Sequence, residues 1–131
     1  MTRERNPLKR KEGNRVKTFV VFIALLIMFP TAVSAHVHMR ESSPKQGAVV
    51  TVPPGRVRIT FSNSVEPTFS TVTVIDSSGT TVSRKTQFLE DNTVMETELL
   101  KNIAPGKYTV KWKCVSPDGH KQTGSYTFTI K

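Results

Sequence analysis

Apolar and polar side chains alternate in two runs near the end of the chain, which predicts two strands with one buried face each. The intervening segment, Ser116–His120, is rich in turn-forming residues. We therefore expect a hairpin whose loop presents the carboxylate of Asp118 and the imidazole of His120. The residues on the apolar side are Tyr108, Val110, Trp112 and Cys114 in the first run and Tyr126, Phe128 and Ile130 in the second.

Shorter extended runs precede this hairpin, and turn-forming stretches such as Pro53-Pro54-Gly55 and Asp76–Gly79 separate them. No segment after Ala35 shows a helical period. About seven short strands with such turns predict an all-β protein, an antiparallel β-sandwich. Tyr108 follows a Pro-Gly turn at a strand start, the position of a tyrosine corner in such folds. The expected strands before the hairpin cover residues 48–52, 56–61, 71–75, 80–89 and 93–99.

The first 35 residues differ from the rest in composition. Residues 1–17 contain seven Lys and Arg and two Glu, and an uncharged apolar run of eleven residues follows from Phe19 to Phe29. Val33 and Ala35 are small residues at positions −3 and −1 of a cleavage site. This order predicts a secretory signal peptide over residues 1–35, which leaves a single domain over residues 36–131. The alternative is an uncleaved N-terminal anchor, although the apolar run is shorter than the roughly 20 residues that span a bilayer.

The charge of the chain is uneven. The whole sequence has a net charge of +9, but residues 36–131 contain twelve Lys and Arg and eight Asp and Glu, a net charge of +4. Because the N-terminal segment supplies the rest, the high isoelectric point does not indicate nucleic-acid binding. The single cysteine, Cys114, excludes an internal disulfide, and its inward phase predicts a buried structural thiol.

The three histidines, His36, His38 and His120, suggest a metal site. Cleavage after Ala35 makes His36 the first residue, and its amine and Nδ1 then form a chelate. His120 adds a third nitrogen and Asp118 an oxygen, a donor set that suits Cu(II). Zn(II) accepts the same ligands, usually as a tetrahedron, whereas Ca(II) requires more oxygens.

His38 has three interpretations. At position three of a mature chain it forms a self-contained Cu(II) or Ni(II) chelate with the amine and two backbone amides. Alternatively, it is a further ligand or neighbour of the folded site, or an exposed strand residue. Soft sulfur ligands are scarce, because the domain contains only Met39 and Met95. A Cu(I) thioether site is therefore not expected, and we predict that Met39 belongs to the core.

The sequence over residues 36–131 resembles the CopC-type copper-resistance family, which are exported copper-binding domains of bacteria. The first shared motif is His36 followed by Ser42-Ser43-Pro44, and the second is the strand Arg58–Ser62 followed by Phe69-Ser70. The third and most specific is Gly106–Phe128, with its Val-Ser-Pro-Asp-Gly-His segment.

The resemblance implies a Greek-key β-sandwich, also called cupredoxin-like or Ig-like, that binds one Cu(II) ion. It implies as ligands His36, Asp118 and His120, and His38 in those members with a histidine at position three. Some members also bind Cu(I) through a Met-rich loop, a pattern from which Thr68–Met95 departs. Others continue into a membrane copper importer, which for this chain is expected as a separate protein.

We therefore expect an exported, extracytoplasmic Cu(II) carrier, a monomer without enzymatic activity, that serves copper resistance or delivery to an importer. Two alternatives remain. A copper held by an N-terminal histidine also occurs in oxidative polysaccharide-cleaving enzymes. In an Ig-like interaction module without metal, Asp118 and His120 only shape a turn.

Overall fold

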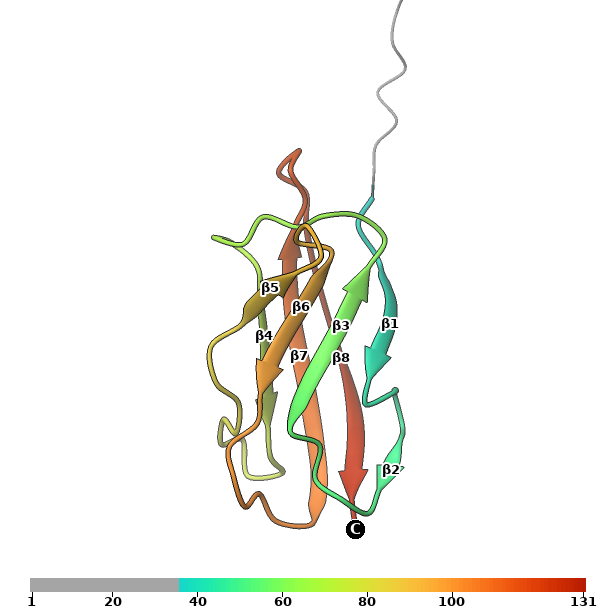
Figure 1. The fold of residues 1–131 in the computed structure, drawn as a ribbon, viewed down its shortest axis with the longest axis vertical. Helices are drawn as coiled ribbons and strands as arrows, with labels where there is room; N and C mark the ends of the chain where they lie inside the picture. The colour runs from blue at the N-terminus through green and yellow to red at the C-terminus, as the bar shows by residue number, and fades with distance from the viewer. Residues whose placement is uncertain (1–35) are drawn as a thin grey trace, which may run out of the picture. The chain divides into compact units, whose positions relative to one another are not determined.

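The computed structural model describes residues 36–131, which form two four-stranded sheets (Figure 1). The predicted signal peptide lies outside the described residues. One sheet has the strand order β1-β3-β6-β5, and the other has the order β2-β8-β7-β4. The strands are β1 (Met39–Ser43), β2 (Val49–Val50), β3 (Arg56–Phe61), β4 (Thr71–Ile75), β5 (Gln87–Leu89), β6 (Val94–Glu98), β7 (Gly106–Val115) and β8 (Lys121–Ile130).

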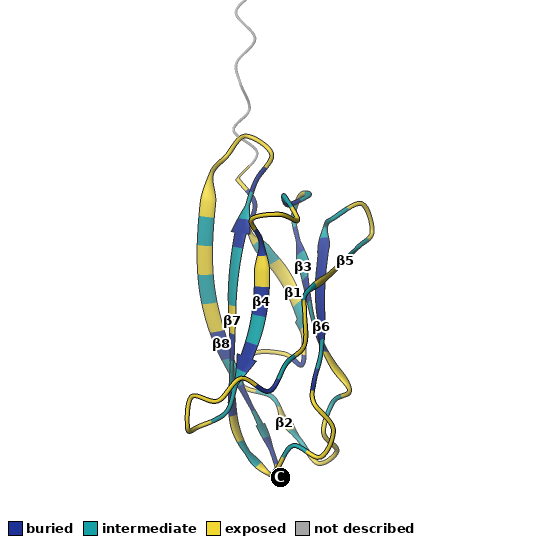
Figure 2. Ribbon diagram, turned by 90° about the vertical axis from the view of Figure 1, so that its left-hand side faces the viewer, coloured by how far each residue is buried: buried dark blue, intermediate teal, exposed yellow. Residues whose placement is uncertain are grey.

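The two sheets form the layers of a β-sandwich, which confirms the predicted fold class, with eight strands where about seven were predicted (Figure 2). All pairs within the sheets are antiparallel except β2 with β8, a short parallel contact through Val49 and Val50. No helix in the described range 36–131 is long and apolar enough to cross a membrane.

The core lies between the sheets and follows the alternation in the sequence. On β3, Val57, Ile59 and Phe61 are buried, while Arg56 and Thr60 are not. Trp112 is only partly buried but packs edge-on against Phe61, with ring centroids 5.4 Å apart. The other inward residues of the predicted hairpin are all buried: Tyr108, Val110, Cys114, Tyr126, Phe128 and Ile130.

Two smaller predictions about the core are also confirmed. The Tyr108 hydroxyl donates a hydrogen bond to the carbonyl oxygen of Ala104, four residues earlier, as a tyrosine corner does. Cys114 is fully buried, and burial raises the pKa of its thiol. It is therefore a structural residue and a poor nucleophile or metal ligand.

The predicted strand over residues 80–89 is wrong for most of its length, because only Gln87–Leu89 form a strand there. Side-chain hydroxyls explain the difference. Val72 donates its amide hydrogen to Thr86 Oγ1 (3.0 Å) and Val74 donates to Ser83 Oγ (2.9 Å). Since these hydroxyls satisfy the amides at the edge of β4, residues 80–86 make only isolated bridges instead of a continuous ladder.

Candidate metal centre

The β7–β8 hairpin carries the candidate loop at one end of the sandwich. Its strands are longer than predicted and pair over ten residues each, from Gly106↔Ile130 to Val115↔Lys121. The loop is closed by backbone hydrogen bonds from Ser116 to the carbonyl of His120 (2.9 Å) and from Gly119 to that of Ser116 (2.8 Å). Gly119 has φ of +87°, a conformation that glycine adopts without strain. The loop position is therefore fixed by the strands, and its shape by local hydrogen bonds.

Ser116 organises the polar side chains of this loop. It is 2% exposed, and its hydroxyl donates to Asp118 Oδ1 and lies 3.1 Å from the carbonyl oxygen of His120. A hydrogen bond from Ser116, and to a smaller extent one from His120, lowers the pKa of Asp118 to about 2. The carboxylate is therefore charged over the whole physiological range. Ser116 was not among the predicted site residues, although its place two residues before an Asp-Gly turn is typical of such a cap.

His120 is held by the same carboxylate. Its Nδ1 lies 2.8 Å from Asp118 Oδ2, and both side chains are substantially exposed, at 66% and 44%. An imidazole that donates from Nδ1 keeps the Nε2 lone pair available for a metal ion. Asp118 thus either orients His120 or shares a metal ion with it.

His36 lies next to this loop, although the two are far apart in the sequence. The described chain begins at the same end of the sandwich as the β7–β8 loop (Figure 1). The His36 and His120 rings are 6.2 Å apart between centroids, at an interplanar angle of 29°. One metal ion can bridge this span, since each imidazole nitrogen binds at about 2 Å.

His38 is placed differently. Its backbone amide donates to Ser62 Oγ (3.1 Å), and its carbonyl accepts from the Ser62 amide (2.9 Å). The Ser62 hydroxyl also lies 3.3 Å from the carbonyl oxygen of His36. Within residues 36–131, no hydrogen bond, ion pair or ring contact joins the His38 side chain to Asp118 or His120. Ser62, which the sequence analysis also missed, therefore fixes the backbone of the segment that carries both histidines.

The side chains as they lie do not form a complete metal site. Within the described range, no three His, Cys, Asp or Glu residues are grouped so that they could hold one metal ion. The structure thus brings His36, Asp118 and His120 to one end of the sandwich, with Asp118 bonded to His120. The four-residue ligand set stays a prediction.

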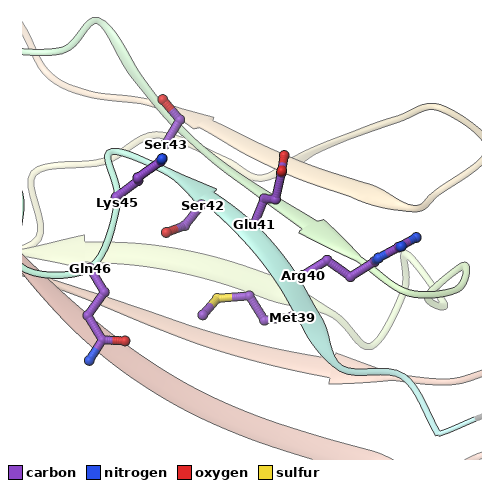
Figure 3. A pocket seen from close by; sticks show the side chains of 7 residues that line it. All are labelled: Met39, Arg40, Glu41, Ser42, Ser43, Lys45 and Gln46. Carbon is purple, nitrogen blue, oxygen red and sulfur yellow. The ribbon is translucent and has the colours of Figure 1, made fainter.

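A separate hollow of about 560 Å³ lies beside β1, lined by that strand together with Lys45 and Gln46 (Figure 3). Met39 and Arg40 point to different sides of β1, and Met39 packs partly buried against the core as predicted. Met95, the other methionine of the described residues, is fully buried. The two sulfur atoms are therefore core groups and leave no exposed thioether cluster in residues 36–131.

Comparison with known proteins gives a consistent result. The family model described as CopC domain matches residues 39–131. A Bacillus subtilis protein named copper transport protein CutJ is 31% identical over 118 residues, which are 88% of this chain. The matched region spans only 22% of the length of that protein.

Two solved structures share the fold. The crystal structure of CopC from Methylosinus trichosporium OB3b matches with a TM-score of 0.66 and 31% identity, over 73% of this chain and 94% of that one. PcoC, a methionine-rich copper resistance protein from Escherichia coli, matches with a TM-score of 0.66 and 29% identity, over 74% of this chain and all of that one. In PcoC, therefore, a chain no longer than the aligned region forms the complete fold.

Proposed function

Because this chain belongs to the CopC domain family, we propose that its β-sandwich is an exported Cu(II)-binding protein for copper resistance or homeostasis. Copper is its cargo, one ion per domain, and binding without catalysis is its activity. The observation that carries the proposal is the placement of His36 beside the Asp118–His120 loop, with the two imidazole rings 6.2 Å apart.

The proposed ligands are the amine and imidazole of His36, the carboxylate of Asp118 and the imidazole of His120. Removal of residues 1–35 creates the amine, so processing of the signal peptide also completes the site. Nitrogen-rich sites with one carboxylate favour Cu(II) among the common divalent metals. His38 is a candidate fourth side chain, and its exposed position on the same segment supports this role.

The proposed setting is extracytoplasmic, where the domain buffers Cu(II) or passes it to a separate membrane importer. Support comes from two relatives, one named a copper transport protein and the other a copper resistance protein. The exposure of His120, at 66%, suits a site that exchanges its ion with a partner.

The experiment is a Cu(II) titration of two forms of the domain, one that starts at His36 and one with an additional glycine before it. The extra residue moves the amine away from the His36 imidazole and breaks the chelate, so affinity should fall by orders of magnitude. The same two forms are then compared with His120→Ala in each. Tight binding that survives His120→Ala would assign the copper to the His36-Val37-His38 tripeptide alone and overturn the folded site.

Acidification gives a second test. The Asp118 pKa of about 2 means that this carboxylate stays deprotonated as the pH falls from neutral toward 4. Protons therefore compete at the amine and the imidazoles rather than at this carboxylate, and copper affinity should fall in the range where these nitrogen groups take up protons. Affinity that remains constant from neutral to strongly acidic pH would contradict these ligands.

A further inference from the structure

The outer faces of the two sheets differ in charge. The strands β1, β3, β5 and β6 together contain three arginines and three glutamates. The strands β2, β4, β7 and β8 contain no acidic residue and four lysines, namely Lys107, Lys111, Lys113 and Lys121. We call the outer side of β4, β7 and β8 the lysine face.

The register places these lysines among short hydroxyl side chains. Lys111 lies between Thr73 on β4 and Ser125 on β8, and the next outward residue of β7, Lys113, lies between Thr71 and Thr123. Alternate positions along β7 and β8 are exposed or half-exposed (Figure 2). Because Ser and Thr are short, the lysines project beyond them, and the hydroxyls remain available to an oxygen-rich anion.

The lysine face is not neutralised within the domain. Among residues 36–131, every ion pair involves an arginine or a histidine, and none involves a lysine. The acidic residues that border this sheet lie in its end loops, Glu66 and Asp118 at one end and Asp76 at the other. Lys111 and Lys113 are about 7 Å apart along the strand, well inside the Debye length of about 10 Å at moderate salt. Their fields therefore add.

An exposed aromatic residue borders this face. Phe69 is 59% exposed and lies two residues before Thr71, the first residue of β4. Its neighbour Ser70 accepts a hydrogen bond from the Val115 amide (3.0 Å), which ties this loop to the end of β7. Exposed aromatic side chains beside basic ones are typical of surfaces that bind at a membrane interface.

We propose that the lysine face and Phe69 dock the domain on an anionic phospholipid bilayer. The charge complements the lipid headgroups, the sheet face is broad enough to contact several headgroups, and Phe69 enters the interfacial region. A soluble polyanion neutralises the lysines equally well but provides no apolar environment for Phe69. The observations therefore favour the bilayer. In this pose the β7–β8 hairpin lies along the membrane, and the Asp118–His120 loop stays at the end of the sandwich. This docking is independent of the copper ligands.

The test is sedimentation of the domain over residues 36–131 with vesicles of phosphatidylglycerol and phosphatidylcholine, compared with vesicles of phosphatidylcholine alone. Binding is expected only to the anionic vesicles and should weaken as salt is raised. Each lysine near an anionic surface contributes roughly fivefold in affinity. Lys111→Glu with Lys113→Glu should therefore reduce binding by at least roughly twentyfold, and the Gln pair should reduce it less.

The matched control is Arg40→Glu with Lys101→Glu, which makes the same change in net charge on exposed residues outside the lysine face. This control should retain most of the vesicle binding, and Phe69→Ala should lower the affinity for anionic vesicles several-fold. Circular dichroism establishes that each variant is folded. Equal losses in both charge pairs, or no binding to anionic vesicles, would overturn the proposal. A third outcome would also overturn it: the domain binds dextran sulfate as tightly as it binds the anionic vesicles, and Phe69→Ala changes neither affinity.

Discussion

The β7–β8 hairpin contains two regions that are specified in different ways. Its strands are fixed by ten cross-strand pairs and by a row of buried side chains that includes Val110 and Phe128. Its loop is exposed, and a few polar contacts around Ser116 determine its shape. Stability therefore depends on the strands, whereas the proposed copper site depends on the loop and on His36. Substitutions in one region should leave the property of the other nearly unchanged.

The largest expected effect comes from His120→Ala in the loop. This change removes one proposed copper ligand, so Cu(II) affinity should fall by orders of magnitude in a competition titration. The side chain is 66% exposed, so the free energy of unfolding should change by no more than about 0.5 kcal/mol. A large loss of stability with unchanged copper affinity would show that this loop stabilises the fold and does not bind copper.

Glu96→Ala tests the sheet scaffold away from the loop. The Glu96 side chain is 2% exposed, and its carboxylate accepts hydrogen bonds from Arg56 (2.7 Å) and Arg58 (2.9 Å). Removing it leaves Arg56 without its acidic partner and Arg58 with only the more distant Glu90 (3.8 Å), although both guanidinium groups are about half exposed and regain water. We expect a loss of about 2–3 kcal/mol in denaturant unfolding with unchanged copper affinity.

Glu98→Ala is the matched control on the same strand. Glu98 is 45% exposed and 3.8 Å from Arg84 Nε, a pair of the kind that contributes about 0–1 kcal/mol. If Glu96→Ala and Glu98→Ala cost the same, the buried carboxylate has no special role in joining β3 to β6.

Gly124→Ala tests the packing inside the hairpin itself. Gly124 pairs with Trp112, and a Cβ at this position would clash with Cζ2 of the indole ring. The ring must move against Phe61, so a loss of about 1–3 kcal/mol in thermal or denaturant unfolding is expected. Gly55→Ala has no atom within 4 Å of the added Cβ and should be close to neutral. Equal effects of the two changes would argue that Trp112 does not pack as described.

The smallest effect at neutral pH is expected for Tyr126→Phe. Burial raises the pKa of Tyr126 to about 12, with a partial offset from Ser42, and its hydroxyl has no hydrogen-bond partner of normal geometry among residues 36–131. The folded state thus keeps a proton that the unfolded state loses above pH 10, and stability falls as the pH rises from about 10 to 12. Alkaline denaturation should be shallower in the phenylalanine variant, and an unchanged pH dependence would contradict this assignment.

The strand scaffold could be predicted from the sequence because burial on one face imposes a period of two. Val57, Ile59 and Phe61 show this clearly, since both the strand and its inward face follow from three apolar residues. The strand predicted over residues 80–86 is absent because the hydroxyls of Ser83 and Thr86, and not backbone carbonyls, accept the amide hydrogens of β4 there. The ion pairs of Glu96 were also not predicted, because alternation gives the face of each strand but not the register between two strands.

Only part of the candidate site could be predicted from the sequence. Residue chemistry indicated His36, Asp118 and His120. Their proximity depends on the fold, since the segment before β1 and the β7–β8 loop lie at the same end of the sandwich. The role of Ser62 could not be predicted, since it depends on the pairing of β1 with β3, whereas Ser116 occupies a capping position that the following Asp-Gly turn makes recognisable. The position of the His38 backbone likewise depends on its hydrogen bonds to Ser62.

The most direct test of the central claim is a pulsed electron paramagnetic resonance measurement that counts the imidazoles bound to Cu(II). It requires the domain starting at His36 in excess over copper, with His120→Ala as the comparison. If one ion is held jointly by His36 and His120, the variant shows one coordinated imidazole fewer than the native domain. An identical imidazole count in the two proteins would contradict a site that joins the N-terminus to the β7–β8 loop.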